Sequence, residues 1–362
     1  MNAPDLSGHA FSALECPGHD NRRPISEHLT VLPLDDAQLR LLNGYQRNFP
    51  FCHAPFQKIA CDLATDEISV LRLARESMAR NAISRLGPVF APHAVGASCL
   101  AALEVSSGRL DKVVAQLNRH VGVNHNYLRE HPINLWFVAS ASDEERLAAV
   151  LEAIEQEANC GPLVRCPLIE EYRIDLGFDL INQDRPCRSR SFVERPQHLT
   201  TIQRRIVGTL QSGLPLTSHP YQTVAETLDI NEWQLLDQLT RWQESGVIRR
   251  MGFVVRHHEL GFNANAMVVW SVPEVLSHIV GQRLAHECGV TLCYRRQATP
   301  PRWPYNLYCM VHGRTRAQTQ QCITRITATA GLQGFPQAVL FSTMRFKQSG
   351  ATYANDPVPS HA

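Results

Sequence analysis

Residues 248–261 read IRRMGFVVRHHELG, and residues 83–96 carry the same framework as ISRLGPVFAPHAVG. Isoleucine, arginine, glycine, histidine and glycine recur at matching places, with a constant offset of 165 positions. The same offset relates Phe56 to Tyr221, each of which stands between a proline and a glutamine. An offset that is held across turn glycines indicates that a whole folding unit has been duplicated. The chain is therefore predicted to be an internal pseudo-dimer, whose function lies where the two copies differ.

Composition is typical of a globular protein. The 362 residues are 44% apolar and 19% charged, which allows each copy to bury a core. The formal net charge of +1 argues against a dedicated nucleic-acid binder, which usually carries a strongly basic domain. We expect no membrane span and no signal peptide, because residues 1–20 lack a basic start followed by an apolar run. The eleven cysteines include no CxxC pair, which favours reduced thiols and a cytoplasmic location.

Each copy is predicted to contain two units in the same order. Three short helices and a strand that enters a turn are typical of a winged helix-turn-helix. The next block alternates as βαββαβ, which predicts a four-stranded antiparallel sheet with two helices on one face, the ferredoxin-like arrangement. The predicted fold class is α+β, an internal duplication of both units. The expected boundaries are a disordered tail 1–34, winged helix 35–95, sheet unit 96–183, linker 184–198, winged helix 199–261, sheet unit 262–347 and tail 348–362.

One predicted strand of the first copy, residues 123–131, carries an unusual set of side chains. Since side chains alternate faces along a strand, His125, Tyr127, Arg129 and His131 are expected on one face. Such groups make poor core material, because each needs a polar partner when buried. The face is either solvated, as antiparallel sheets often allow, or a site for an anionic aromatic ligand. We favour the ligand site.

The second copy keeps only part of this set. Tyr294 and Arg296 match Tyr127 and Arg129, whereas Leu292 replaces His125. The hairpin that follows is about five residues longer in the second copy and contains Arg302, Trp303 and Tyr305. These residues are predicted to form a stiff, cationic, aromatic lip. The alternative is a structural hairpin in which Trp303 is packed down, as tryptophan often is.

The predicted wings and recognition helices bear on DNA binding. Arg256, His257 and His258 follow the second wing, where they are suited to phosphates or to the carboxylates of a small molecule. A recognition helix presents phosphate-facing donors near its N-terminus. Here the two candidate helices begin with Asp66-Glu67 and Asn231-Glu232, and the carboxylates would repel DNA. The helix-turn-helix is therefore expected to be structural, and DNA is not an expected partner.

The order of units resembles the Lrp/AsnC transcription regulators, and several motifs resemble the siroheme decarboxylases more closely. These motifs are HNYLREH (125–131), NLWF (134–137), IDLGFDL (174–180), RMGF (250–253), RHHELGF (256–262), YRR (294–296) and WPYNL (303–307). The resemblance covers roughly residues 39–346. In that family two related subunits usually pair. Here they look fused, as in the fused proteins of haem d1 biosynthesis.

The resemblance implies a reaction: carbon dioxide is lost from the C12 and C18 acetate side chains of siroheme, giving 12,18-didecarboxysiroheme. Such a carboxy-lyase needs no cofactor, since the siroheme iron belongs to the substrate, and no resident metal is expected. Homologous decarboxylase subunits are implied as partners. Two alternatives remain: an Lrp/AsnC-type regulator that senses a small metabolite, and a non-catalytic tetrapyrrole carrier.

Siroheme is a flat iron macrocycle with eight carboxylates, so its site needs aromatic walls and several cations. Histidine can supply a proton near neutral pH. The predicted catalytic residues are His125 as proton donor with His131 and Arg129, and His131 or the His257–His258 pair could instead contact iron. The predicted substrate-binding residues are Tyr127, Tyr294, Arg295, Arg296, Arg302, Trp303, Tyr305, Arg256, His257 and His258.

Overall fold

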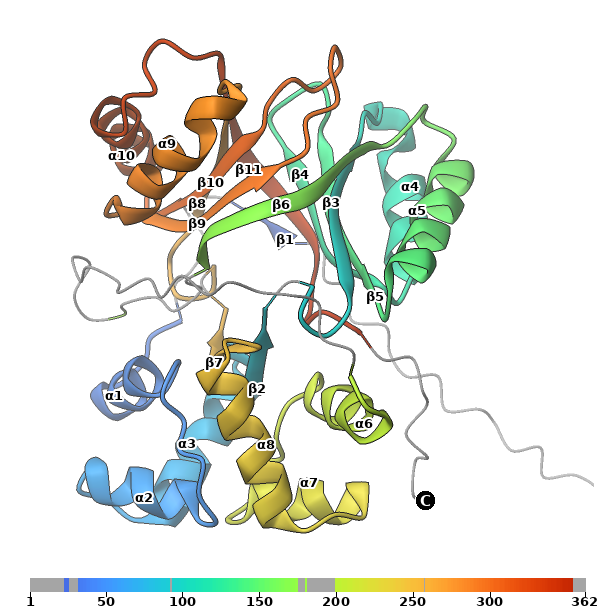
Figure 1. Ribbon diagram of the computed structural model, residues 1–362. Helices are drawn as coiled ribbons and strands as arrows, with labels where there is room; N and C mark the ends of the chain where they lie inside the picture. Colours follow the sequence, from blue (N-terminus) through green and yellow to red (C-terminus); the bar gives the residue numbers. More distant parts are fainter. Residues whose placement is uncertain are drawn as a thin grey trace, which may run out of the picture.

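The computed structural model describes residues 23–25, 32–91, 93–174, 180, 199–256 and 258–353. They form two layers, with the helix-turn-helix units at the bottom of Figure 1 and the sheet units above. The predicted linker 184–198 lies outside the described residues, as do most of the two predicted tails. Two tail segments contradict the prediction of disorder: β1 (Arg23–Pro24) pairs with β11 (Gln337–Gln348), and the Tyr353 side chain is buried.

The helix-turn-helix layer is a single structure built by both copies. The first copy supplies α1 (Asp36–Gly44), α2 (Pro55–Asp62), α3 (Glu67–Ala79) and β2 (Ile83–Phe90), and the second supplies α6 (Thr201–Leu210), α7 (Pro220–Leu228), α8 (Glu232–Glu244) and β7 (Ile248–Val255). The predicted hairpin wing in each copy is wrong. Instead, β2 runs without a turn and pairs antiparallel with β7, with Gly87 opposite Gly252. The two copies therefore share one two-stranded sheet.

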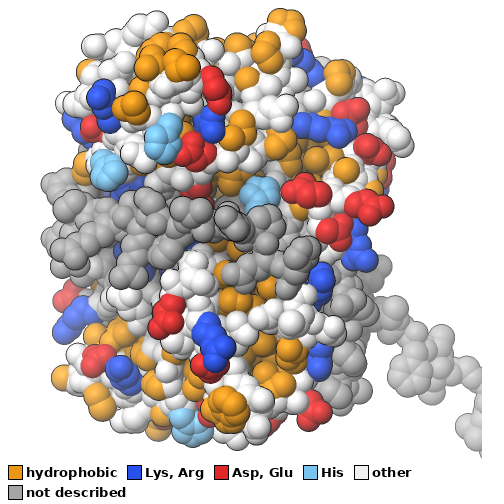
Figure 2. Space-filling model, in the orientation of Figure 1, with side chains coloured by type: hydrophobic (Ala, Val, Ile, Leu, Met, Phe, Trp, Pro, Cys, Tyr) orange, Lys and Arg blue, Asp and Glu red, His pale blue; other side chains and the backbone are white. Residues whose placement is uncertain are grey.

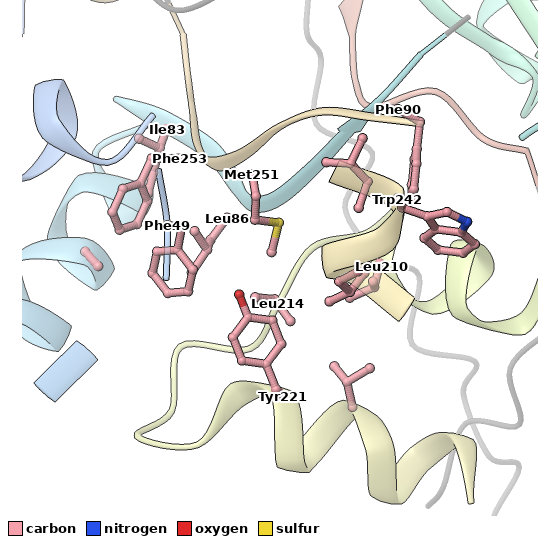
Figure 3. Close-up of a cluster of buried hydrophobic side chains, with 14 of the residues drawn as sticks. Phe49, Ile83, Leu86, Phe90, Leu210, Leu214, Tyr221, Trp242, Met251 and Phe253 are labelled. Carbon is pink, nitrogen blue, oxygen red and sulfur yellow. The ribbon is translucent and has the colours of Figure 1, made fainter. Parts of the chain in front are cut away.

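A continuous apolar core joins the two halves of this layer (Figure 3). The Phe49 ring lies 5.3 Å from the Phe56 ring of its own copy and 6.1 Å from the Phe253 ring of the other copy. The Tyr221 hydroxyl donates a hydrogen bond of 3.0 Å to the Pro50 carbonyl. Because apolar burial is the main favourable term in folding, this shared core ties the two helix-turn-helix units together.

Local sequence explains where several of these helices begin. Pro55 and Pro220 each open a helix, at a position where proline's fixed φ suits the backbone and its missing N–H is no loss. The Asp66 side chain caps α3 by accepting a hydrogen bond of 2.8 Å from the Ser69 amide. That carboxylate is thus engaged in helix capping, as its placement next to the positive helix end suggests.

Each sheet unit has the predicted order of elements. The first contains β3 (Ala97–Leu103), the 3-10 turn Ser107–Arg109, α4 (Leu110–Arg119), β4 (Val123–Arg129), β5 (Leu135–Ala141), α5 (Glu144–Ala158) and β6 (Val164–Ile174). The second contains β8 (Ala264–Trp270), α9 (Glu274–His286), β9 (Val290–Arg296), β10 (Leu307–Gly313), α10 (Arg316–Thr329) and β11. The strand orders β4-β5-β3-β6 and β9-β10-β8-β11 confirm two four-stranded units.

The two sheets are joined at both edges. β11 pairs antiparallel with β4, and β6 pairs antiparallel with β9, so eight strands close into a ring and β1 is added beside β11. We call these junctions the β4–β11 seam and the β6–β9 seam. Closure leaves none of the eight strands as an open edge. Each seam combines a strand of one copy with a strand of the other, and the seams lie on opposite sides of the ring.

Helices cover the outside of the ring, α4 and α5 on one sheet and α9 and α10 on the other (Figure 1). The inner faces meet around Trp136, Met267 and Tyr308, all buried. On the face drawn in Figure 2, basic and acidic side chains are interspersed and do not gather in one basic patch. Among the described residues, no helix has the length and apolar character needed to cross a membrane.

Candidate functional site

The first copy contributes three polar side chains to the inside of the β4–β11 seam. His125, Tyr127 and Arg129 share the inner face of β4, while Asn126 faces outward and donates a hydrogen bond of 3.1 Å to Asn118 in α4. The His125 and Tyr127 rings lie 6.4 Å apart with their planes 16° from parallel. The Arg129 guanidinium lies 5.7 Å from the centre of the Tyr127 ring. Its Nη1 atom donates a hydrogen bond of 3.2 Å to the Leu340 carbonyl in β11, and this bond anchors the Arg129 side chain across the seam.

The second copy supplies the opposite wall of this seam. Arg345 of β11 stands directly opposite Tyr127 in the strand register. The Arg345 side chain is only 3% exposed, and its guanidinium pairs with the Glu259 carboxylate at 3.0 Å. The His258 ring centre lies 6.3 Å from that of Tyr127. The Asn265 side-chain nitrogen lies 3.2 Å from His258 Nδ1. The seam therefore combines aromatic, cationic and imidazole groups from both copies.

Burial keeps the imidazoles of this seam neutral. It lowers the pKa of His125 to about 4. It also lowers the pKa of His312 to about 3, with the positive charge of Arg129 acting in the same direction. The pKa of His258 lies well below its usual value because of burial first, and then because of the Arg345 charge. An anionic ligand would oppose each of these effects by stabilising the protonated imidazoles. The β4–β11 seam is thus electrostatically suited to a polyanion.

The proton-donor role predicted for His125 depended on the near-neutral pKa of an ordinary histidine. That assumption is wrong, because burial leaves the His125 imidazole neutral at pH 7. Burial likewise raises the pKa of Tyr127, so its phenol keeps its proton. A bound anion would raise the pKa of His125 again, because it stabilises the charged imidazolium.

Of the predicted wing residues, two belong to this seam. Arg256 is near enough to Tyr127 for its positive charge to act against the effect of burial on the Tyr127 pKa. His258 contacts Tyr127 as described above. His257 lies outside the described residues.

Four residues of the seam were missed by sequence reasoning: Arg345, Glu259, Asn265 and His312. Periodicity predicted their strands but not which strands pair across the copies. For two of them, the sequence did contain a signal. Asn265 and His312 are polar, stand in otherwise apolar strands, and are register partners in the β8–β10 pair. The His312 Nδ1 atom lies 2.8 Å from the Thr291 hydroxyl.

The predicted lip is packed into the protein. Trp303 is fully buried in the inner core, and its indole nitrogen donates a hydrogen bond of 2.6 Å to the Tyr308 hydroxyl. Tyr305 packs edge-on against Trp303, with ring centres 4.9 Å apart, and Arg302 donates to the Pro162 carbonyl. The alternative interpretation, a structural hairpin, is therefore the one observed, and the prediction of a substrate-facing lip is wrong.

His131 also departs from its prediction. β4 ends at Arg129, so the alternation that would place His131 beside Tyr127 stops before it. Its Nδ1 atom accepts a hydrogen bond of 3.0 Å from the Ile133 amide, and its ring packs against Trp303 at 5.3 Å. The structure thus places His131 at the hairpin and not among the imidazoles of the β4–β11 seam.

Tyr294 and Arg296 occupy the equivalent place at the other seam, so the structure does not bring them to His125. Tyr294 stands opposite Glu171 of β6. The Arg296 guanidinium lies 5.0 Å from the Tyr294 ring centre and donates a hydrogen bond of 3.0 Å to the Cys166 carbonyl. The geometry thus copies that of Tyr127 and Arg129. The prediction of a single site combining both tyrosines is wrong.

Arg295, predicted to bind substrate, points to the outer face of β9. Its guanidinium pairs there with Glu170 at 3.3 Å and also with Glu274 at the start of α9. It therefore crosses the β6–β9 seam on the outer face and does not reach the inner face of either seam. Within the described ranges, no three His, Cys, Asp or Glu side chains are arranged to hold a metal ion.

Comparisons with known proteins match both layers. The family profile described as "AsnC-like ligand binding domain" matches residues 94–173 and 259–347, which span the two sheet units. The profile described as "Siroheme decarboxylase NirDL-like HTH domain" matches residues 203–249.

Individual relatives match either most of the chain or one half of it. A siroheme decarboxylase NirDL subunit of Paracoccus denitrificans is 38% identical over 326 residues, covering 89% of this chain and 99% of the relative. A siroheme decarboxylase NirL subunit of Stutzerimonas stutzeri is 49% identical over 145 residues, 40% of this chain and 85% of that subunit. The crystal structure of the siroheme decarboxylase NirDL in co-complex with an iron-uroporphyrin III analogue aligns with a TM-score of 0.63 at 27% identity, over 88% of this chain and 93% of that chain.

Proposed function

The chain belongs to the siroheme decarboxylase family, and we propose that it removes carbon dioxide from siroheme at the β4–β11 seam. The observation that carries the choice of site is the convergence of Arg129, Arg345, His258 and Tyr127 from two copies on one buried place. Arginine forks bind carboxylates in pairs, and a tyrosine ring offers an apolar face to a flat macrocycle. A relative's co-complex with an iron-uroporphyrin analogue supports a porphyrin-type substrate.

The proposed reaction is non-oxidative and acts on the C12 and C18 acetates, giving 12,18-didecarboxysiroheme in haem d1 biosynthesis. The bond between the carboxylate carbon and the side-chain methylene breaks, and its electron pair stays on the methylene carbon. Carbon dioxide leaves, and a proton then converts the methylene to a methyl group. This balance places the enzyme among the carbon–carbon lyases and requires no redox cofactor, since the iron belongs to the substrate.

The seam residues would have separate roles in this reaction. Arg129, Arg345 and Arg256 would hold the carboxylates that are retained. The buried surroundings would disfavour the carboxylate that leaves, relative to neutral carbon dioxide. The bound carboxylates would raise the pKa of His125 from about 4 and so allow it to carry the proton that the methylene carbon needs. His258 is the second imidazole placed to assist, through either a proton or the iron.

The regulator alternative has less support, because a relative that covers 89% of this chain is named a siroheme decarboxylase subunit. A salt-dependent mobility shift on DNA would be its signature. We also infer a cytoplasmic location and association with homologous decarboxylase subunits, which exist as separate chains in relatives.

Anaerobic incubation of the purified chain with siroheme, followed by mass spectrometry, tests the proposal. The expected result is stepwise loss of two carbon dioxide molecules without any added cofactor. Siroheme that stays unchanged, in the presence and absence of homologous subunits, would reject the proposed activity.

A further inference from the structure

The two seams are built alike but carry opposite charge at one pair of matching positions. Tyr127 in β4 stands opposite Arg345 of β11, and Tyr294 in β9 stands opposite Glu171 of β6. The neighbouring contacts also match, because Arg129 donates to the Leu340 carbonyl and Arg296 donates to the Cys166 carbonyl. Arg345 and Glu171 therefore occupy the same place in the two halves of the pseudo-dimer.

The ion-pair partners of these two residues also carry opposite charges. Arg345 pairs with Glu259, whose match in the first copy is Ala94. Glu171 pairs with Arg249 at 2.9 Å, and the match of Arg249 is Ser84. The Arg249 and Glu171 side chains are 7% and 16% exposed, so the pair is largely withdrawn from solvent. The β6–β9 seam thus has its own internal carboxylate at the place where the β4–β11 seam offers a guanidinium.

We propose that the charge at this one position decides which seam accepts the tetrapyrrole, so that each chain binds one substrate molecule, at Arg345, and excludes it at Glu171. This inference rests on the proposed function, because it takes a polycarboxylate macrocycle as the ligand. In the β4–β11 seam, a substrate carboxylate replaces Glu259 as the partner of Arg345. In the β6–β9 seam, the buried Glu171 repels the same carboxylate, and Arg249 is already neutralised.

Titration of the full chain with iron-uroporphyrin, followed by absorbance and calorimetry, tests the assignment. The wild type is expected to bind one macrocycle per chain. Arg345→Gln should weaken binding about tenfold to a hundredfold, the range for losing a hydrogen bond to a charged group. Arg345→Lys keeps the charge and should retain most of the affinity, although it also disturbs the pair with Glu259. Comparing the two variants separates the role of the charge from a purely structural role.

Glu171→Gln is the matched control, because it changes the equivalent position of the other seam. It should leave the affinity at the β4–β11 seam unchanged and allow a second macrocycle to bind at the β6–β9 seam, because it removes the repelling carboxylate and releases Arg249. A Glu171→Gln variant that still binds one macrocycle would show that this carboxylate does not exclude the second. Two equal sites in the wild type, or an Arg345→Gln variant with wild-type affinity and a wild-type melting curve, would overturn the inference. A parallel siroheme turnover assay on the wild type separates the two proposals. Failure of turnover with one-to-one, Arg345-dependent binding rejects the activity alone, whereas turnover with unaltered Arg345→Gln binding rejects the inference alone.

Discussion

His125 is the residue on which the proposed chemistry depends most. Its ring lies 6.4 Å from Tyr127 and is the imidazole that the other copy lacks, since Leu292 takes its place. General acids of this kind contribute about a hundredfold to ten-thousandfold to a rate. His125→Ala should therefore lower siroheme turnover at least about a hundredfold while iron-uroporphyrin still binds. Rate and affinity measured on the same preparation check this.

His131→Ala is the control for that experiment, because its ring packs on Trp303 in the hairpin. It should retain most of the turnover. A reversed pattern, with turnover lost in His131→Ala and kept in His125→Ala, would move the proton donor to the hairpin. Loss of binding in His125→Ala would instead make the residue a ligand-binding group.

The buried imidazoles also predict how stability depends on pH. Burial lowers the pKa of His125 to about 4, so between about pH 6.5 and 4 the unfolded chain binds more protons than the folded chain. The free energy of unfolding without substrate should therefore fall as pH falls through this window. Urea unfolding at about pH 7, 6 and 5 measures the slope.

In that series, His125→Gln should make the slope shallower. A wild-type stability that rises towards pH 5, or a slope that is unchanged in His125→Gln, would show that His125 is not held neutral by burial.

At the residue scale, the sequence predicted side-chain positions correctly where polar residues follow the two-residue alternation of a strand. The alternation of β4 placed His125, Tyr127 and Arg129 on one face, and the structure has them there. It failed for Arg295, whose predicted role ignored the same alternation, and for Trp303, whose burial depends on contacts with distant strands. Arg345 was missed because its importance follows only from standing opposite Tyr127.

At the element scale, β7 approaches the backbone of the segment that follows α1 closely at Gly252. A Cβ atom at Gly252 would lie 2.1 Å from the Tyr45 carbonyl oxygen and 2.5 Å from the Gln46 carbonyl carbon, both of which are backbone atoms. Gly252→Ala should therefore lower the free energy of unfolding by about 1–3 kcal/mol. Chemical unfolding measures the change. Gly44→Ala is the control, because a Cβ there meets nothing within 4 Å. Equal stabilities for the two variants would contradict this packing.

The elements themselves were largely predictable, and their pairing was not. Period and turn residues located the strands of each sheet unit in the right order. The glycine and proline at 87 and 88 suggested a turn, yet β2 continues through them because its partner is β7 of the other copy. Closure of the ring by β11 on β4 likewise depends on long-range contacts, which leave no periodic trace in the sequence.

At the scale of the whole molecule, each copy completes the other. The helix-turn-helix core contains residues of both copies, and both seams pair strands from different copies. A chain cut between residues 181 and 198 should therefore yield two pieces that copurify when coexpressed and that aggregate or unfold when expressed singly. Size exclusion and circular dichroism check this outcome. Two pieces that each fold as stable monomers would contradict the shared core.

The proposed function places the tetrapyrrole where β4 and β11 meet. A crystal structure of the chain grown with iron-uroporphyrin tests this most directly. We expect one macrocycle per chain, lying against the Tyr127 and His258 rings with a carboxylate on Arg345. A macrocycle beside Tyr294 at the β6–β9 seam, or one bound on the helix-turn-helix layer, would contradict it.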